Sequence, residues 1–132
     1  MVEVLLDTNF LISCVKQKIH FVDAIKELLS DSEIVVPAQV VSELQRISTD
    51  HDRKYRLEDR EHASLALQLI VKYRVIKGKG KYADKAIIGY VHEKNYRSEQ
   101  VIVATIDSGL VSKVRNVSRV IKIRGLKRLV IE

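Results

Sequence analysis

The chain has 132 residues, of which 46% are hydrophobic and 30% charged, with a net charge of +6 and one cysteine, Cys14. Length and composition predict a single domain over residues 1–132 and exclude disordered and fibrous proteins, while a lone cysteine excludes a disulfide framework or a multi-cysteine metal site. No segment has the roughly 18 uninterrupted apolar residues of a membrane span. Because residues 1–7 also lack the features of a secretory signal, we expect a complete cytoplasmic protein without membrane contact.

Apolar runs alternate with helical patterns along the whole chain. Short apolar runs predict strands, and apolar residues three and four positions apart predict the helices between them. In chain order, we expect a strand at residues 2–6, a helix at 21–29, a strand at 34–36 closed by Pro37, helices at 37–47 and 58–72, a strand at 74–76, a helix at 82–94, a strand at 101–104, a helix at 109–115 and a strand at 118–123. This alternation is typical of a three-layer α/β/α fold with a mainly parallel central sheet.

Two details of this pattern are testable in the structure. In the helix at residues 58–72, we expect Leu65, Leu69 and Ile70 to face the core. Residues 77–81 (KGKGK) form a glycine-punctuated basic loop that is expected to be flexible. The loop lacks the spacing of a phosphate-binding P-loop or a dinucleotide-binding fingerprint.

Two carboxylates stand at the ends of predicted strands. Asp7 follows the strand at residues 2–6, and Asp107 comes shortly after the strand at residues 101–104. Ligands of open α/β sheets bind at the carboxyl ends of strands, and a buried acid there is unfavourable unless something pairs with it. A metal ion is the simplest explanation for two such acids in one crevice. The alternative is that each acid caps the helix that follows it.

Two further acids interrupt apolar helix faces. Glu43 lies between Val41 and Leu44 on the helix after the second strand, and Asp84 lies in the first turn of the helix at residues 82–94. Taken singly, Glu43 is more simply explained as an exposed residue at a helix edge, and Asp84 as an N-cap or an acid favoured by the helix dipole. Four acids at these topological positions together favour one acidic site.

Four segments in chain order resemble the motifs of PIN-domain ribonucleases. Residues 4–11 (VLLDTNFL) resemble the opening motif, and residues 36–44 (VPAQVVSEL) the second, in which a glutamate follows a strand–proline–helix junction. Residues 82–87 (YADKAI) are similar to the third motif, and residues 103–110 (VATIDSGL) to the fourth. The resemblance covers essentially the whole chain, and the chain looks most like compact archaeal members akin to the rRNA-processing nucleases of the small-subunit processome.

Two positions depart from the family pattern. Ile106 stands where a polar residue is common, and Gly109 stands where many members carry a further acid. Where those family residues help to order metal or metal-bound water, their replacement implies weaker activity here.

The resemblance implies that four acids hold one or two Mg²⁺ or Mn²⁺ ions and carry the catalysis: Asp7, Glu43, Asp84 and Asp107. Hard divalent cations prefer such oxygen ligands. Of the four, Glu43 is either a ligand or a base that orients water, and the others are direct ligands. Thr105 is implied as a further catalytic-site residue that, with Thr8 or Asn9, orients the carboxylates through hydrogen bonds.

The positive charge is concentrated in two segments. Residues 46–81 hold ten Lys or Arg against five Asp or Glu, and residues 107–132 hold seven against two, whereas residues 1–45 are acidic. Basic segments attract polyanions such as nucleic acid, although a merely solvated surface has the same composition. The resemblance implies that RNA phosphates are bound by seven residues that flank the acids in sequence: Arg46, Arg53, Lys54, Arg56, Lys77, Lys79 and Lys81.

The lead hypothesis is therefore a metal-dependent endoribonuclease. Tyr55 and Tyr82 could stack on unpaired bases, although core or plain surface roles are commoner, and His51 is expected to be a solvated loop residue. The partner would be a pre-ribosomal particle if the enzyme processes rRNA, or a small antitoxin protein if it is a toxin. A homodimer is also expected, because dimers are common in the family.

Two other classes compete with this hypothesis. One is a PIN module that binds RNA without cutting it, and the four intact acids argue against it. The other is a response-regulator receiver, which needs an adjacent acidic pair after its first strand. Asp7 is preceded by Leu6, so this second class is disfavoured.

Overall fold

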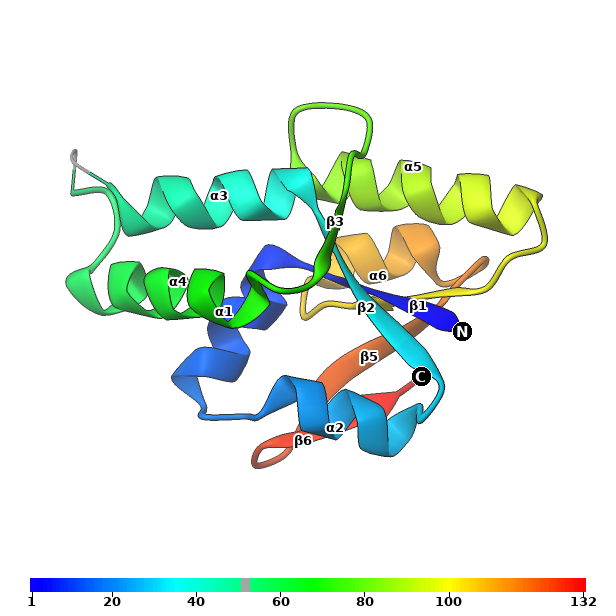
Figure 1. The fold of residues 1–132 in the computed structure, drawn as a ribbon, viewed down its shortest axis with the longest axis horizontal. Coiled ribbons are helices and arrows are strands. Elements are labelled where there is room, and N and C mark those ends of the chain that lie inside the picture. Colours follow the sequence, from blue (N-terminus) through cyan, green and yellow to red (C-terminus); the bar gives the residue numbers. More distant parts are fainter. Residues whose placement is uncertain (51–52) are drawn as a thin grey trace.

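A six-stranded sheet forms the centre of the protein (Figure 1). The computed structural model describes residues 1–50 and 53–132. Its strands in chain order are β1 (Val2–Leu6), β2 (Ser32–Pro37), β3 (Arg74–Ile76), β4 (Val101–Ala104), β5 (Arg119–Arg124) and β6 (Arg128–Ile131). They lie in the order β3-β2-β1-β4-β5-β6, with β6 antiparallel to β5 and all other neighbours parallel. The predicted mainly parallel sheet is confirmed.

Helices cover both sides of this sheet. One side carries α1 (Thr8–Lys16), α2 (Phe21–Leu28), α3 (Ala38–Ser48) and α4 (Leu57–Ile70), and the other carries α5 (Ala83–Tyr96) and α6 (Ser108–Val114). Because side chains alternate along a strand, Val4 and Leu6 of β1 join the first core and Leu5 joins the second. The predicted three-layer architecture is confirmed. Among the helices of the described residues, none is long and apolar enough to cross a membrane.

The inward face of α4 differs from the prediction. Ile70 is buried as predicted, but Leu65 and Leu69 are each 44% exposed, so their predicted inward orientation is wrong. Ala63 and Ala66 are fully buried instead. The reason is that α4 packs against α1 and α3, and small side chains allow this close approach.

The strand β6 is absent from the sequence-based prediction. The predicted strand at residues 118–123 corresponds to β5, after which residues 125–127 turn the chain back and β6 pairs with β5. Leu129 of β6 is buried, whereas Arg128 beside it is exposed. An alternation of only four residues is too short to separate a strand from a loop by its pattern.

The register between β1 and β4 determines where the predicted acids meet. Leu6 pairs with Ala104, and the backbone N–H of Asp7 donates to Ala104 O at 3.0 Å. Asp7 and residues 105–107 therefore leave the sheet side by side. We call this end of the sheet, where β1, β2 and β4 finish, the carboxyl edge.

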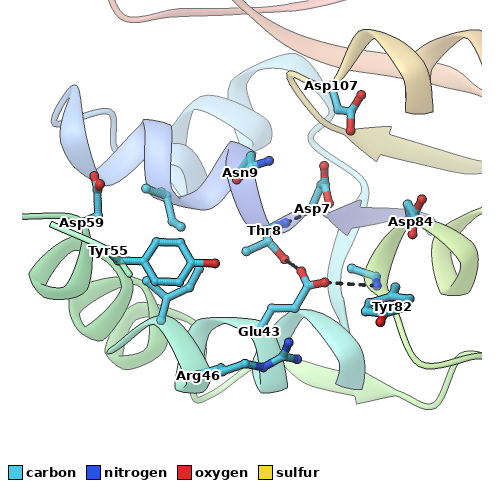
Figure 2. Close-up of a pocket in the computed structure, with 13 residues that line it drawn as sticks. Asp7, Thr8, Asn9, Glu43, Arg46, Tyr55, Asp59, Tyr82, Asp84 and Asp107 are labelled. Carbon is cyan, nitrogen blue, oxygen red and sulfur yellow. Dashed lines mark hydrogen bonds between the residues drawn. The ribbon is translucent and has the colours of Figure 1, made fainter. Parts of the chain in front are cut away.

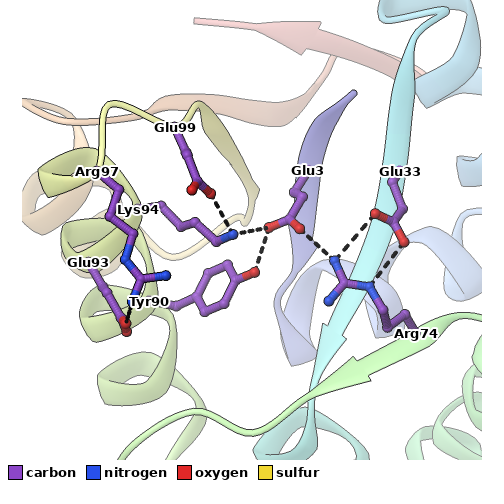
Figure 3. Close-up of polar contacts among 8 residues, drawn as sticks. All are labelled: Glu3, Glu33, Arg74, Tyr90, Glu93, Lys94, Arg97 and Glu99. Carbon is purple, nitrogen blue, oxygen red and sulfur yellow. Dashed lines mark hydrogen bonds and ion pairs between the residues drawn. The ribbon is translucent and has the colours of Figure 1, made fainter.

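Six polar residues form a cluster at the opposite end of the sheet, where these strands begin: Glu3, Glu33, Arg74, Tyr90, Lys94 and Glu99 (Figure 3). Arg74 donates to Glu3 at 2.5 Å and to Glu33 at 3.1 Å. Glu3 also accepts a hydrogen bond from Tyr90 Oη at 2.5 Å. This amino-edge cluster ties β1, β2, β3 and α5 together.

Candidate active site

Asp7 connects the end of β1 to the start of α1. Its Oδ1 accepts a hydrogen bond from Thr8 N at 2.9 Å, and its Oδ2 accepts one from Thr105 Oγ1 at 2.8 Å. The residue is only 7% exposed. Burial raises the pKa of the Asp7 carboxyl above its usual value and these hydrogen bonds oppose the rise, whereas the charges of Asp107 and Glu43 add to it. An ionised Asp7 is therefore short of a positive partner.

Asp107 caps α6 and is linked to Asp7 through Thr105. Its Oδ1 accepts hydrogen bonds from Gly109 N at 2.8 Å and Leu110 N at 3.3 Å. Its own N–H donates to Thr105 Oγ1 at 3.0 Å, and Thr105 is fully buried. Asp7 and Asp107 do cap the helices that follow them, as the alternative interpretation expected, and both acids still lie at the carboxyl edge.

Glu43 projects from α3 toward the starts of α1 and α5 (Figure 2). Its Oε2 accepts a hydrogen bond from Thr8 Oγ1 at 2.5 Å, and its Oε1 accepts a long one from Ala83 N at 3.4 Å. The side chain is half-buried rather than exposed at a helix edge. Asp84, in the first turn of α5, is exposed and accepts a hydrogen bond from Lys85 N at 2.9 Å.

All four predicted acids line one cavity of about 540 Å³ at the carboxyl edge. Figure 2 shows Asp7 between Asp107 and Glu43, with Asp84 beside them. Within the described residues, none of the four forms an ion pair. The fold therefore gathers negative charge in this cavity, and no cation of the described residues lies within ion-pair distance of the four acids.

The donor set suits a hard divalent cation without enclosing it. Carboxylate oxygens are the ligands that Mg²⁺ and Mn²⁺ prefer. In the part of the chain that the structure describes, no three His, Cys, Asp or Glu side chains converge closely enough to hold an ion between them. Mg²⁺ in proteins usually binds one or two carboxylates and keeps several waters. The cavity fits an ion held in this way.

Basic and aromatic residues border the cavity. Arg46, in the last turn of α3, lines it, and so do Tyr55 and Tyr82, which are 44% and 49% exposed. Around Tyr55, between α3 and α4, lie three exposed cations: Arg53, Lys54 and Arg56. His51 lies outside the described residues.

The basic loop at residues 77–81 is anchored to the helices beside it. Its three exposed cations are Lys77, Lys79 and Lys81. Gln39 Nε2 of α3 donates to Gly78 O and to Gly80 O, both at 2.8 Å. A Cβ at Gly78 would lie 2.5 Å from Ala86 Cβ, so only glycine fits against α5 here. The loop that we expected to be flexible is therefore held against α3 and α5.

A fifth acid in the cavity escapes sequence analysis. Asp59 is half-buried in the first turn of α4 and lies with Tyr55 at the end of the cavity away from Asp84 (Figure 2). Acids are common in the first turn of a helix, and Glu58 beside it has the same pattern. Only the packing of α4 against α3 distinguishes the two.

The two departures from the family pattern lie beside the cavity. Ile106 is 45% exposed and is not part of its lining. A Cβ at Gly109 would lie 3.2 Å from Asp107 Oδ1, which is a tight contact. Gly109 therefore gives Asp107 the space to cap α6.

Residues 4–126 match the family model described as a PIN-like domain. The chain belongs to the PIN-like domain family. Ribonuclease VapC4 from Methanocaldococcus jannaschii is 36% identical to this PIN-like domain over 115 residues, which cover 86% of this chain and 83% of the relative. The predicted resemblance to the PIN-domain family is confirmed.

Solved structures show the same fold. The PIN domain endonuclease Utp24 superposes with a TM-score of 0.75 at 22% identity, over 98% of this chain and 90% of that one. VapBC2 from Rickettsia felis, bound to a DNA fragment from its promoter, gives a TM-score of 0.57 at 12% identity, over 93% and 100% of the two chains. At these identities, the likeness extends to the fold alone.

Proposed function

We propose that this PIN-like domain is a metal-dependent endoribonuclease that hydrolyses phosphodiester bonds in RNA. The proposal rests on one observation: four acids from separate segments line one cavity and, among the described residues, have no ion-pair partner. Gathering such charges is unfavourable unless a cation joins them. A relative that is 36% identical is named a ribonuclease, which supports RNA as the substrate.

Three acids are proposed as direct ligands of one or two Mg²⁺ or Mn²⁺ ions, with one or two carboxylates on each ion: Asp7, Asp84 and Asp107. Glu43 is a further ligand or the base that orients the attacking water. When bound, the metal would activate water and stabilise charge on the leaving oxygen. Thr105 is a positioning residue, because its hydroxyl donates to Asp7 and accepts from Asp107 N.

The RNA strand is proposed to bind along the basic borders of the cavity. Phosphates would be neutralised by Arg46 in the cavity and by exposed cations in the segments that contain or precede the lining residues Tyr55 and Tyr82: Arg53, Lys54, Arg56, Lys77, Lys79 and Lys81. Contacts of this kind give salt-dependent affinity with little sequence preference. Tyr55 and Tyr82 offer exposed rings on which unpaired bases can stack, which predicts a preference for single strands.

Cleavage of a labelled single-stranded RNA in Mn²⁺ tests the proposal. We expect the wild type to cut, and cutting to stop in EDTA and in Asp7→Asn, which keeps the shape of the side chain but removes its charge. Glu33→Gln removes a carboxylate from the amino-edge cluster and should cut like the wild type. Cleavage that survives Asp7→Asn would contradict the proposed site. Tight salt-dependent RNA binding without cleavage by the wild type would instead indicate a non-cleaving RNA-binding module.

We further propose that the enzyme acts in the cytoplasm as a homodimer, either in rRNA processing or as the toxin of a toxin–antitoxin pair. The two roles differ in partner, a pre-ribosomal particle in the first and a small antitoxin protein in the second. Purification of the tagged protein from its own cells, followed by RNA sequencing and mass spectrometry, separates them. Enriched precursor rRNA supports the first role, and a stoichiometric small protein supports the second.

A further inference from the structure

A basic hairpin lies outside the cavity, formed by β5, β6 and the turn at residues 125–127. One of its faces points into the core through side chains such as Ile121 and Leu129, which are buried. The register of the two strands puts three cations together on the opposite face: Lys122, Arg124 and Arg128. Glu132 pairs with the first two of these, at 3.3 Å and 2.6 Å.

The end of the hairpin carries cations that the fold does not neutralise. Arg128 lies directly opposite Arg124, and like charges at such positions repel. Lys127 has a φ of 58°, in the left-handed region that residues other than glycine rarely occupy. Within the described residues, neither Lys127 nor Arg128 has a carboxylate at ion-pair distance. Leu126 at the tip is 96% exposed. The two cations without an ion pair among the described residues, Lys127 and Arg128, favour an anionic partner.

The strand register puts the turn of the hairpin at the carboxyl edge of the sheet, where β1 and β4 also end. Thr105 N donates to Ile121 O at 3.1 Å, so β5 is level with the end of β4 at this residue and continues beyond it to Arg124. In the strand order, the loop at residues 77–81 follows β3 on one side, the acids follow β1 and β4 in the middle, and the hairpin lies on the other side. The carboxyl edge is therefore basic, then acidic, then basic again.

We propose that the end of the β5–β6 hairpin is a second RNA-binding surface, which holds the strand on the side of the acids opposite to the loop at residues 77–81. This inference rests on the proposed function, which makes RNA the polyanion that crosses this edge. Six strands at a spacing of about 4.8 Å span about 24 Å, so an RNA of several nucleotides contacts loop, cavity and hairpin together. Because the hairpin and the acidic cavity share one edge of the sheet, a single RNA strand can contact both, whereas the acids have no role in binding an anionic membrane surface.

Binding of a single-stranded RNA about 20 nucleotides long, measured by fluorescence anisotropy in EDTA at several salt concentrations, tests the hairpin separately from cleavage. We expect Lys127→Glu combined with Arg128→Glu to weaken binding at least about tenfold. The slope of log affinity against log salt should fall by about 1.4, because each lost phosphate contact on a single strand removes about 0.7.

The matched control combines Lys113→Glu with Arg119→Glu, which change the net charge equally. Both residues are exposed, and they lie at the end of α6 and the start of β5, away from the carboxyl edge. We expect this variant to bind RNA within about threefold of the wild type, because exposed charges beyond a Debye length of about 10 Å are largely screened. An equal loss in hairpin variant and control would overturn the proposal.

A second variant keeps the test valid if the charge reversal disturbs folding. Lys127→Gly removes the cation and relieves the left-handed backbone, so the melting temperature should not fall. RNA affinity should still drop about threefold. Unchanged affinity in both hairpin variants would overturn the proposal. The proposal would also be overturned if the wild type bound phosphatidylglycerol vesicles and the charge reversal abolished that binding but left RNA binding intact.

The two proposals fail in different ways. Hairpin variants that lose RNA binding as expected, in a protein that cleaves no RNA in Mn²⁺, would support the hairpin surface and reject the endoribonuclease. Metal-dependent cleavage by a protein whose hairpin variants bind like the wild type would reject the hairpin surface alone.

Discussion

At the amino edge of the sheet, Glu3 and Glu33 both accept hydrogen bonds from Arg74, so each acid has a cation within the fold. At the carboxyl edge, Asp7 and Asp107 accept hydrogen bonds from hydroxyl and backbone N–H groups and, within the described residues, pair with no cation. The pKa values follow this difference. The hydrogen bond from Arg74 lowers the pKa of Glu33, whereas burial raises the pKa of Asp7. The acids of the amino edge therefore have a counter-charge within the fold, whereas those of the carboxyl edge have none at ion-pair distance among the described residues.

The largest expected effect separates the two edges by activity. Asp107→Asn should keep the cap on α6, because asparagine caps helices about as well as aspartate. It removes one proposed ligand charge, so the cleavage rate in Mn²⁺ should fall at least about 100-fold with an unchanged melting temperature. Glu33→Gln is the control, and its rate should equal that of the wild type. Equal rates for both variants would remove the functional distinction between the edges.

Thr105 allows a test of how the carboxyl-edge acids are held. Thr105→Val keeps the shape of the side chain but removes the hydroxyl that joins Asp7 to Asp107. We expect a drop of about 1–3 kcal/mol in the free energy of unfolding, from chemical denaturation, and a 10- to 100-fold drop in cleavage rate. Thr105→Ser should restore both. Full activity in Thr105→Val would show that the hydroxyl does not position the acids.

At the amino edge, we expect an effect on stability without an effect on activity. Glu3→Gln removes the charge that joins Arg74, Tyr90 and Lys94. The free energy of unfolding should fall by about 1–2 kcal/mol, since hydrogen bonds to a charged group are lost but Arg74 is half-exposed. Chemical denaturation and cleavage rates at a temperature well below melting measure the two quantities. A large loss of cleavage would mean that the amino-edge cluster is more than structural.

The smallest expected effect is on how the free energy of unfolding changes with pH, measured in EDTA. The folded pKa of Asp7 is raised, so its ionised form costs stability above that pKa, and the cost disappears as the pH falls through it. Asp7→Asn should therefore be more stable than the wild type at pH 7, with the difference vanishing in acid. The folded pKa of Glu33 is lowered, so its contribution is present above the unfolded pKa and is lost as the pH falls through the folded one. Glu33→Gln should be slightly less stable at pH 7, and urea titrations across pH check both signs.

The architecture was predictable because buried strands and amphipathic helices leave periodic patterns over many residues. The inward face of α4 was not predictable, because Leu65 and Leu69 recur at helical spacing just as Ala66 and Ile70 do. The contacts of α4 with α1 and α3 decide between these stripes, and a sequence pattern does not contain them.

The candidate site likewise has a part that the sequence predicts and a part that it does not. The acids at strand ends were predictable because topology alone brings the ends of parallel neighbours together. Gln39 was not, because its amide reaches the loop of Gly78 and Gly80 across about 40 positions of sequence. Asp59 reaches the cavity only through helix packing. A polar residue whose role depends on such a contact has no local signal.

The most direct test of the difference between the two edges is a thermal melt with and without Mn²⁺. A ligand that binds only the folded state at 100 times its dissociation constant adds about 2.7 kcal/mol of stability. We predict that Mn²⁺ raises the melting temperature of the wild type and of Glu3→Gln by the same amount, and leaves Asp7→Asn nearly unchanged. A full Mn²⁺ shift in Asp7→Asn, or its loss in Glu3→Gln, would contradict the claim that the carboxyl-edge acids bind the metal.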